Sequence, residues 1–238
     1  LINAAQNHLI MMDGKHINLE NQASDVITNP LEMGSSPEEA VKKVLSCDKY
    51  KTVFKKYLKT TPQYESVNLE HIASALMLYY SDLSSYSSSF DHAMAEKKPV
   101  NAGVVNGFNL FMSKAQCATC HFVPQFNGTK PPFISSEFEV IGVPADTSFK
   151  TLSNDKGRYG INPAKETQFA FRTGSIRNAG FTKPYMHNGV FKTLEEVIDF
   201  YDAGGGAGKG LLVSNQTLSS DSLKLTKNEK KDIIAFIN

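Results

Sequence analysis

Helical spacing of apolar residues dominates this chain and predicts a mainly α-helical protein. Apolar residues recur three and four positions apart in several stretches, which is the period of a helix with one buried face. Thr193 and Thr226 each precede such a stretch and have a glutamate three residues on, which is the pattern of a capping box. The predicted helices cover 36–58, with a bend near residue 48, then 68–80, 102–114, 194–201 and 227–237.

The stretches between these helices lack a regular apolar period. We expect residues 1–35 to form loops with short helices, because turn-forming pairs are frequent there. Residues 122–180 are rich in Gly, Pro, Asn and Phe and should form long irregular loops. The stretch 81–99 is rich in serine and polar, so we place a domain boundary within it, between 1–95 and 96–238.

Composition indicates a folded globular protein and excludes some functions. The chain has 238 residues, of which 41% are hydrophobic and 21% are charged, so it can form a packed core. A net charge of +1 creates no broad field that would attract nucleic acid, so nucleic-acid binding is disfavoured. No apolar run approaches the roughly 18–20 residues that span a bilayer, so we expect no membrane span.

The most informative motif is Cys117-Ala118-Thr119-Cys120-His121. Its two thiols have the spacing that reaches both vinyl groups of one haem, and the adjacent histidine can bind the iron. A half zinc site would need about two further paired ligands, and Cys47 is the only other cysteine. A redox dithiol would follow a strand rather than a predicted helix. The motif therefore predicts one covalently attached c-type haem with His121 as its proximal ligand.

The haem motif also bears on fold and location. The predicted helix 102–114 leads directly into Cys117, which is the order of elements in a cytochrome c domain. Covalent attachment of haem requires reduced thiols delivered to machinery outside the cytoplasmic membrane. We therefore expect the bacterial periplasm, or an outer surface.

Two further stretches accompany the haem motif. The stretches run from Met12-Asp13-Gly14-Lys15 to Glu32-Met33-Gly34 and from Ser175-Ile176-Arg177-Asn178 to Thr193-Leu194-Glu195-Glu196. In this order and spacing they resemble the bacterial diheme cytochrome c peroxidases and the related diheme enzyme that matures methylamine dehydrogenase. The resemblance implies two cytochrome c-like domains with long irregular loops around covalently bound haem. One haem would be peroxidatic, and the haem at Cys117 would transfer electrons.

The resemblance assigns roles to residues near the N-terminus. Gln22 and Glu32 match a glutamine and a glutamate that line the distal side of the peroxidatic haem. A carboxylate suits this place because it can take a proton from one peroxide oxygen and deliver it to the other. The implied activity is reduction of hydrogen peroxide with electrons from a small redox protein, such as a monohaem cytochrome c or a cupredoxin. A homodimer is left open.

The distal ligand of the haem at His121 has two candidates. The family has methionine or tyrosine at the position that aligns with Tyr201, and Met186 is the competitor. We favour Tyr201, because its capped helix places it on the same face as Leu194, whereas Met186 lies in a turn-rich segment. Thr182 and Pro184 match positions whose backbone carbonyls hold a calcium ion in the family.

The chain departs from the family at two places. Met12 stands where the family has a tryptophan between its haems, and the chain contains no tryptophan. The chain also lacks the first haem motif, so we expect a truncated N-terminus and a second haem bound upstream. Two alternatives remain: a monohaem electron-transfer module without peroxidase activity, and a maturation-type diheme oxidase that acts on a protein partner.

Covalent attachment of haem can be tested by mass. We expect the intact protein to be heavier than its polypeptide by one haem for each CxxCH motif, and this chain contains one such motif. Mass spectrometry under denaturing conditions measures the difference, and a variant with Cys117→Ser and Cys120→Ser should lose it. Haem that extracts into acidified organic solvent and leaves both thiols free would contradict the prediction.

Overall fold

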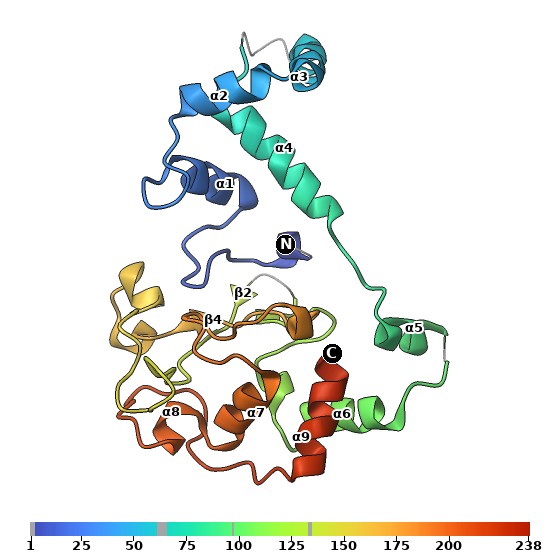
Figure 1. Ribbon diagram of the computed structural model, residues 1–238, viewed down its shortest axis with the longest axis vertical. Coiled ribbons are helices and arrows are strands. Elements are labelled where there is room, and N and C mark those ends of the chain that lie inside the picture. The colour runs from blue at the N-terminus through green and yellow to red at the C-terminus, as the bar shows by residue number, and fades with distance from the viewer. Residues whose placement is uncertain (1–2, 61–65, 97, 133–134) are drawn as a thin grey trace. The chain divides into compact units, whose positions relative to one another are not determined.

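The computed structural model is mainly helical, which confirms the predicted fold class (Figure 1). It describes residues 3–60, 66–96, 98–132 and 135–238. The chain divides into unit 1, Leu1–Ala5 with His16–Ser84, and unit 2, Gln6–Lys15 with Ser85–Asn238. Each unit has buried apolar residues of its own. No helix in the described ranges is both long and apolar enough to cross a membrane.

Unit 1 is built from helices that pack in a small helical core. Its helices within the described ranges are α1 (Leu19–Thr28), α2 (Pro37–Leu45), α3 (Asp48–Thr60) and α4 (Leu69–Asp82). Helix α1 packs against α4, and the buried residues of the two helices are Leu19, Ala23, Ile27, His71, Ile72 and Ala73. The side chains of Ser36 and Asn68 each accept a hydrogen bond of 3.1 Å from a backbone N–H in the first turn of α2 or α4. These caps confirm the predicted helix starts.

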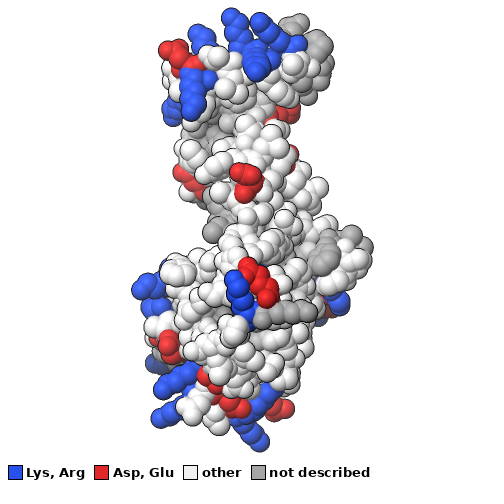
Figure 2. Space-filling model, turned by 90° about the vertical axis from the view of Figure 1, so that its right-hand side faces the viewer, with Lys and Arg blue, Asp and Glu red and all other residues white. Residues whose placement is uncertain are grey.

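Charge is unevenly distributed over unit 1. Helix α3 has the sequence DKYKTVFKKYLKT, with five lysines and one aspartate, and none of its residues is buried. Figure 2 shows the lysine side chains of this region gathered on the surface. The net charge of +1 therefore hides a local basic surface.

Unit 2 combines helices with very short strands. Its helices are α5 (Ser89–Glu96), α6 (Ala102–Met112), α7 (Leu194–Asp202), α8 (Gly205–Gly208) and α9 (Lys227–Ile237). Strand β1 (Thr129–Lys130) pairs antiparallel with β2 (Ser135–Ser136), and β3 (Phe138–Glu139) pairs antiparallel with β4 (Phe171–Arg172). The short 3-10 helices of the chain are η1 (Ala4–Gln6), η2 (Cys117–Thr119), η3 (Arg158–Gly160), η4 (Lys165–Thr167) and η5 (Ala179–Phe181). The described part of 122–180 is thus mostly irregular, as predicted.

The crossing of α6 and α9 organises the core of unit 2. A Cβ atom at Gly107 of α6 would collide with the backbone carbonyl of Asp232 in α9, so glycine permits the close approach of the two helices. The buried cluster beside this crossing consists of Ala115, Leu194, Ile198, Leu225, Ile233 and Ile237. Cys117 packs against the same cluster. The haem motif therefore starts on a rigid helical frame.

Two arginines hold the segment Gln6–Lys15 in unit 2. The Arg172 backbone N–H donates to the carbonyl of Met12 at 2.8 Å, and its Nε donates to the carbonyl of Met11 at 3.2 Å. Arg158 Nη1 donates to the carbonyl of Gly14 at 2.7 Å. Backbone carbonyls thus anchor the segment to the loop region of unit 2, whatever side chain stands at Met12.

Helix α5 is the main element that the apolar pattern missed. Its sequence, SFDHAMAE, follows the serine-rich stretch, and Ser88 caps it by accepting the N–H of Asp91 at 3.1 Å. Phe90 packs its ring on Phe108 and Phe236. Contacts therefore divide the chain after Ser84, and α5 lies in unit 2 rather than with 1–95. Local composition hid this helix because its packing partners are distant in sequence.

The close crossing of α6 and α9 yields a stability prediction. We expect Gly107→Ala to lower the free energy of unfolding by about 1–3 kcal/mol, the usual cost of overpacking, although alanine favours helix by about 1 kcal/mol. Gly160→Ala is the control, because a Cβ atom there meets nothing within 4 Å. Denaturant unfolding of both variants measures the difference. A Gly107→Ala protein as stable as the parent would show that the helices can separate at no cost.

Candidate haem site

The haem motif occupies a single tight turn after α6. Gln116 adopts the left-handed conformation, and η2 (Cys117–Thr119) follows it directly. The N–H groups of Cys120 and His121 both donate to the carbonyl of Cys117, at 3.2 and 2.9 Å. Both thiols are half-buried. This turn keeps the two thiols and the imidazole close together, as attachment to one porphyrin requires.

The environment of the thiols is apolar. Burial raises the pKa of Cys117 to about 12. Burial, followed by the charge of Glu139, raises the pKa of Cys120 to about 11. A redox dithiol or a zinc thiolate needs the opposite shift, because the thiolate is the reactive and metal-binding form. The raised pKa values therefore fit a site that surrounds a porphyrin better than either alternative.

The imidazole of His121 is held in the protonation state that binds iron. Its Nδ1 lies 3.1 Å from the carbonyl oxygen of Phe126, and a carbonyl can only accept, so Nδ1 carries the proton. Burial lowers the pKa of His121 below its ordinary value, which favours the neutral ring. The lone pair then lies on Nε2, the usual arrangement in metal-binding histidines. The residues present therefore fit a haem iron.

Tyr201 lies in the same environment as the thiols. It stands in the last turn of α7, half-buried, and Leu194 on its helix face is buried as expected. Burial raises the pKa of Tyr201, and the charges of Cys117, Cys120 and Glu139 add to the shift. This electrostatic coupling places the phenol near both attachment residues. Met186 is half-buried in a turn that the N–H of Gly189 closes at 3.2 Å. The choice of ligand stays a prediction.

The other predicted site residues lie elsewhere. Gln22 is half-buried in α1, and Glu32 is exposed in the turn after α1, so both belong to unit 1. The Glu32 carboxylate accepts a hydrogen bond of 3.1 Å from Asn29 Nδ2. Thr182 and Pro184 are exposed in unit 2. The described residues contain no cluster of three or more His, Cys, Asp or Glu that could hold a metal, so calcium binding through carbonyls stays a prediction.

Sequence reasoning missed two parts of the site. Glu139 of β3 acts electrostatically on both Cys120 and Tyr201, although an acidic residue in a loop region carries no local signal. The Phe126 carbonyl, which orients His121, is a backbone group and leaves no trace in side-chain patterns. Both depend on how the irregular segment folds back on the haem motif.

Comparisons with known proteins agree with this site. Residues 1–99 match the sequence model of the di-haem cytochrome c peroxidase family. The chain is 29% identical over 240 residues to methylamine utilization protein MauG of Methylorubrum extorquens, covering 100% of the chain and 62% of that protein. It is 30% identical over 258 residues to cytochrome-c peroxidase IdrP1 of Pseudomonas sp. (strain SCT), covering 100% of the chain and 65% of that protein.

A solved structure shares the fold. It is a MauG-like protein associated with microbial copper homeostasis, with a TM-score of 0.77 and 22% identity, and the match covers 97% of this chain and 71% of that one. The chain spans 62% and 65% of the lengths of the two curated relatives. The similarity runs through both units and includes the haem motif. The chain belongs to the di-haem cytochrome c peroxidase family.

Proposed function

We propose that this chain is part of a peroxidase that reduces hydrogen peroxide to water and relays the electrons through a c-type haem at Cys117, Cys120 and His121. The observation that carries the proposal is the neutral His121 ring, whose Nδ1–H bond to Phe126 leaves Nε2 available beside two thiols. Membership of the peroxidase family supports the same conclusion. A bound haem would supply an iron that accepts and releases single electrons.

The protein's own residues would manage the protons of the reaction. Hydrogen peroxide takes up two electrons and two protons to give two water molecules. An ionised Glu32 can accept a proton from one peroxide oxygen and return it to the other, and its hydrogen bond from Asn29 orients the carboxylate. The Gln22 amide can donate a hydrogen bond to the peroxide. This division of roles follows the family resemblance.

The remaining parts of the proposal concern location and partners. A c-type haem would place the protein in the periplasm, with a small redox protein, such as a monohaem cytochrome c or a cupredoxin, as electron donor. A second haem in unit 1 and a calcium ion at the carbonyls of Thr182 and Pro184 complete the cofactors that we propose. A homodimer is compatible with this function.

One observation favours a second candidate, oxidation of a protein partner. The Tyr201 phenol is electrostatically coupled to both attachment cysteines, and a tyrosine ligand is the feature that the family resemblance assigns to the maturation enzyme. A phenolate ligand stabilises ferric iron and supports higher oxidation states than a thioether does. A peroxide-consuming protein that needs no small electron donor would support this candidate.

Peroxide turnover tests the role of Glu32. In the protein as the cell makes it, we expect Glu32→Gln to slow peroxide consumption by about 100-fold or more, because the amide cannot accept and return the proton. Glu70→Gln is the control, because Glu70 is also exposed in unit 1. Steady-state kinetics with excess reductant measure both. Equal rates for Glu32→Gln and the parent would remove Glu32 from the mechanism.

The distal ligand can be identified from absorption spectra of the oxidised protein. We expect Tyr201→Phe to change the spectrum and raise the reduction potential, because loss of a phenolate destabilises ferric iron. Met186→Leu should leave both unchanged. If the oxidised protein instead shows a sulfur-to-iron charge-transfer band that disappears in Met186→Leu, then Met186 is the ligand.

A further inference from the structure

Residues 175–177 hold the loop after the haem motif at three successive carbonyls. Ser175 Oγ donates to the carbonyl of Gln125 at 2.8 Å, the N–H of Ile176 to that of Phe126 at 3.1 Å, and Arg177 Nε and Nη2 to that of Pro124 at 2.9 and 2.7 Å. The guanidinium also lies 5.4 Å from the centre of the Phe126 ring. A short segment far along the chain thus determines the path of residues 124–126.

Phe126 needs such restraint. Its φ of 51° lies in the left-handed region, which is strained for a bulky residue and persists only where surrounding contacts enforce it. Its carbonyl is the group that accepts the Nδ1–H of His121 at 3.1 Å. A change in the loop path would therefore alter this hydrogen bond directly.

Asp91 of α5 anchors Arg177 from the opposite side. Two parallel contacts join Arg177 Nη1 to Asp91 Oδ2 at 2.8 Å and Nη2 to Oδ1 at 3.0 Å, and the side chains are only 12% and 16% exposed. The hydrogen bonds from Arg177 are the main cause that lowers the pKa of Asp91 to about 2, so the pair stays ionised at neutral pH. Ser88 Oγ fixes the same carboxylate at 2.7 Å.

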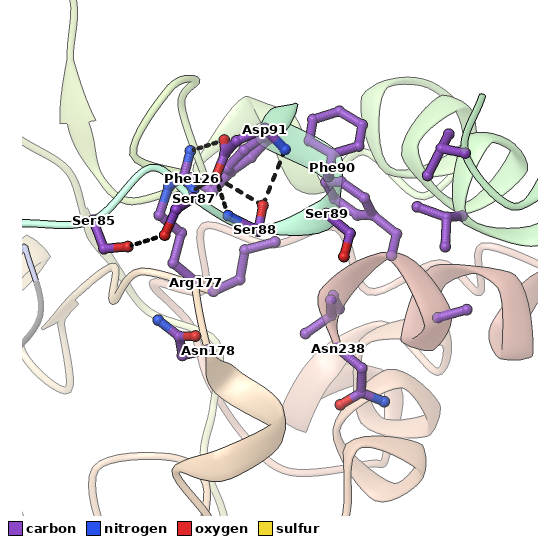
Figure 3. Close-up of a pocket in the computed structure, with 16 residues that line it drawn as sticks. Ser85, Ser87, Ser88, Ser89, Phe90, Asp91, Phe126, Arg177, Asn178 and Asn238 are labelled. Atoms are coloured by element: carbon purple, nitrogen blue, oxygen red, sulfur yellow. Dashed lines mark hydrogen bonds and ion pairs between the residues drawn. The ribbon is translucent and has the colours of Figure 1, made fainter. Parts of the chain in front are cut away.

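The pair forms part of the wall of a cavity of about 350 Å³ (Figure 3). Asp91 and Arg177 are bonded to each other there rather than turned toward a ligand. The Arg177 guanidinium is also stacked 4.9 Å from the centre of the Tyr86 ring. These contacts indicate a positioning role rather than recognition of a ligand.

We propose that Arg177, anchored by Asp91, is a positioning residue for the proximal haem ligand: it holds the Phe126 carbonyl where His121 Nδ1 donates to it. This inference rests on the proposed haem at His121. A strong hydrogen bond to Nδ1 makes the imidazole a better donor to iron and lowers the reduction potential. The conserved geometry of α5 and the haem loop thereby tunes the iron through one carbonyl.

The sign of the potential shift separates positioning from simple charge. Removing the cation of Arg177 acts on the iron through space and, by charge alone, would stabilise ferric iron and lower the potential. Losing the restraint on Phe126 weakens the Nδ1–H bond and raises the potential. Arg177→Met therefore gives opposite results under the two explanations.

The experiment uses the haem-loaded protein and three variants. Arg177→Met removes the restraint, Asp91→Asn weakens its anchor, and Lys114→Met removes a cation that pairs with Glu229 at 2.8 Å instead of with the loop. Mass spectrometry measures haem attachment, paramagnetic NMR measures solvent exchange of the His121 Nδ1–H proton, and redox titration measures the potential.

We expect Arg177→Met to retain haem, to exchange the Nδ1–H proton about tenfold faster or more, the scale of losing roughly one hydrogen bond, and to show a higher potential. Asp91→Asn should shift both quantities in the same direction by less, and Lys114→Met should leave the exchange rate unchanged.

Unchanged exchange with a lowered potential in Arg177→Met would overturn the inference while leaving the proposed function intact. If that variant does not fold, unchanged exchange in Asp91→Asn would overturn it equally. A parent protein without covalent haem would refute the proposed function, and the inference with it.

Discussion

A neutral imidazole coordinates iron only through the ring nitrogen without a proton, and in this chain the Phe126 carbonyl decides which nitrogen that is. The 3.1 Å contact from Nδ1 selects the tautomer and the orientation of His121 together. Burial keeps the ring neutral. The thiols, the phenol of Tyr201 and the core beneath them are useful for haem binding only when this ring is correctly placed.

The helices of unit 2 provide the rigid frame on which this contact depends. Gly107 lets α6 approach the backbone of α9 closely, and the apolar cluster of α7 and α9 packs against Cys117. The loops around the motif have little regular structure of their own, so they require side-chain anchors. Arg177, Arg172 and Arg158 serve this purpose by donating hydrogen bonds to backbone carbonyls. Arginine suits the task because its planar donors can reach more than one carbonyl.

Unit 1 combines two surface features of different kinds. Glu32 stands in an exposed turn that Asn29 organises, where a carboxylate can exchange protons with a small substrate. Helix α3 presents lysines over most of its length. A basic surface of this kind attracts acidic protein surfaces through long-range electrostatics, which mainly affects association rates. The near-neutral net charge of the chain therefore describes neither unit well.

Local rules were enough to predict the helices with capping residues and the haem motif, because these depend on neighbours in sequence. Ser36, Asn68, Thr193 and Thr226 all cap the predicted helices, and the CxxCH spacing carries its chemistry in five residues. The tertiary structure alone decided the place of α5, the coupling of Glu139 to the site and the support of His121 by Phe126 and Arg177. These depend on contacts between residues far apart in sequence, often through backbone carbonyls that every residue possesses, so no local pattern of side chains could reveal them.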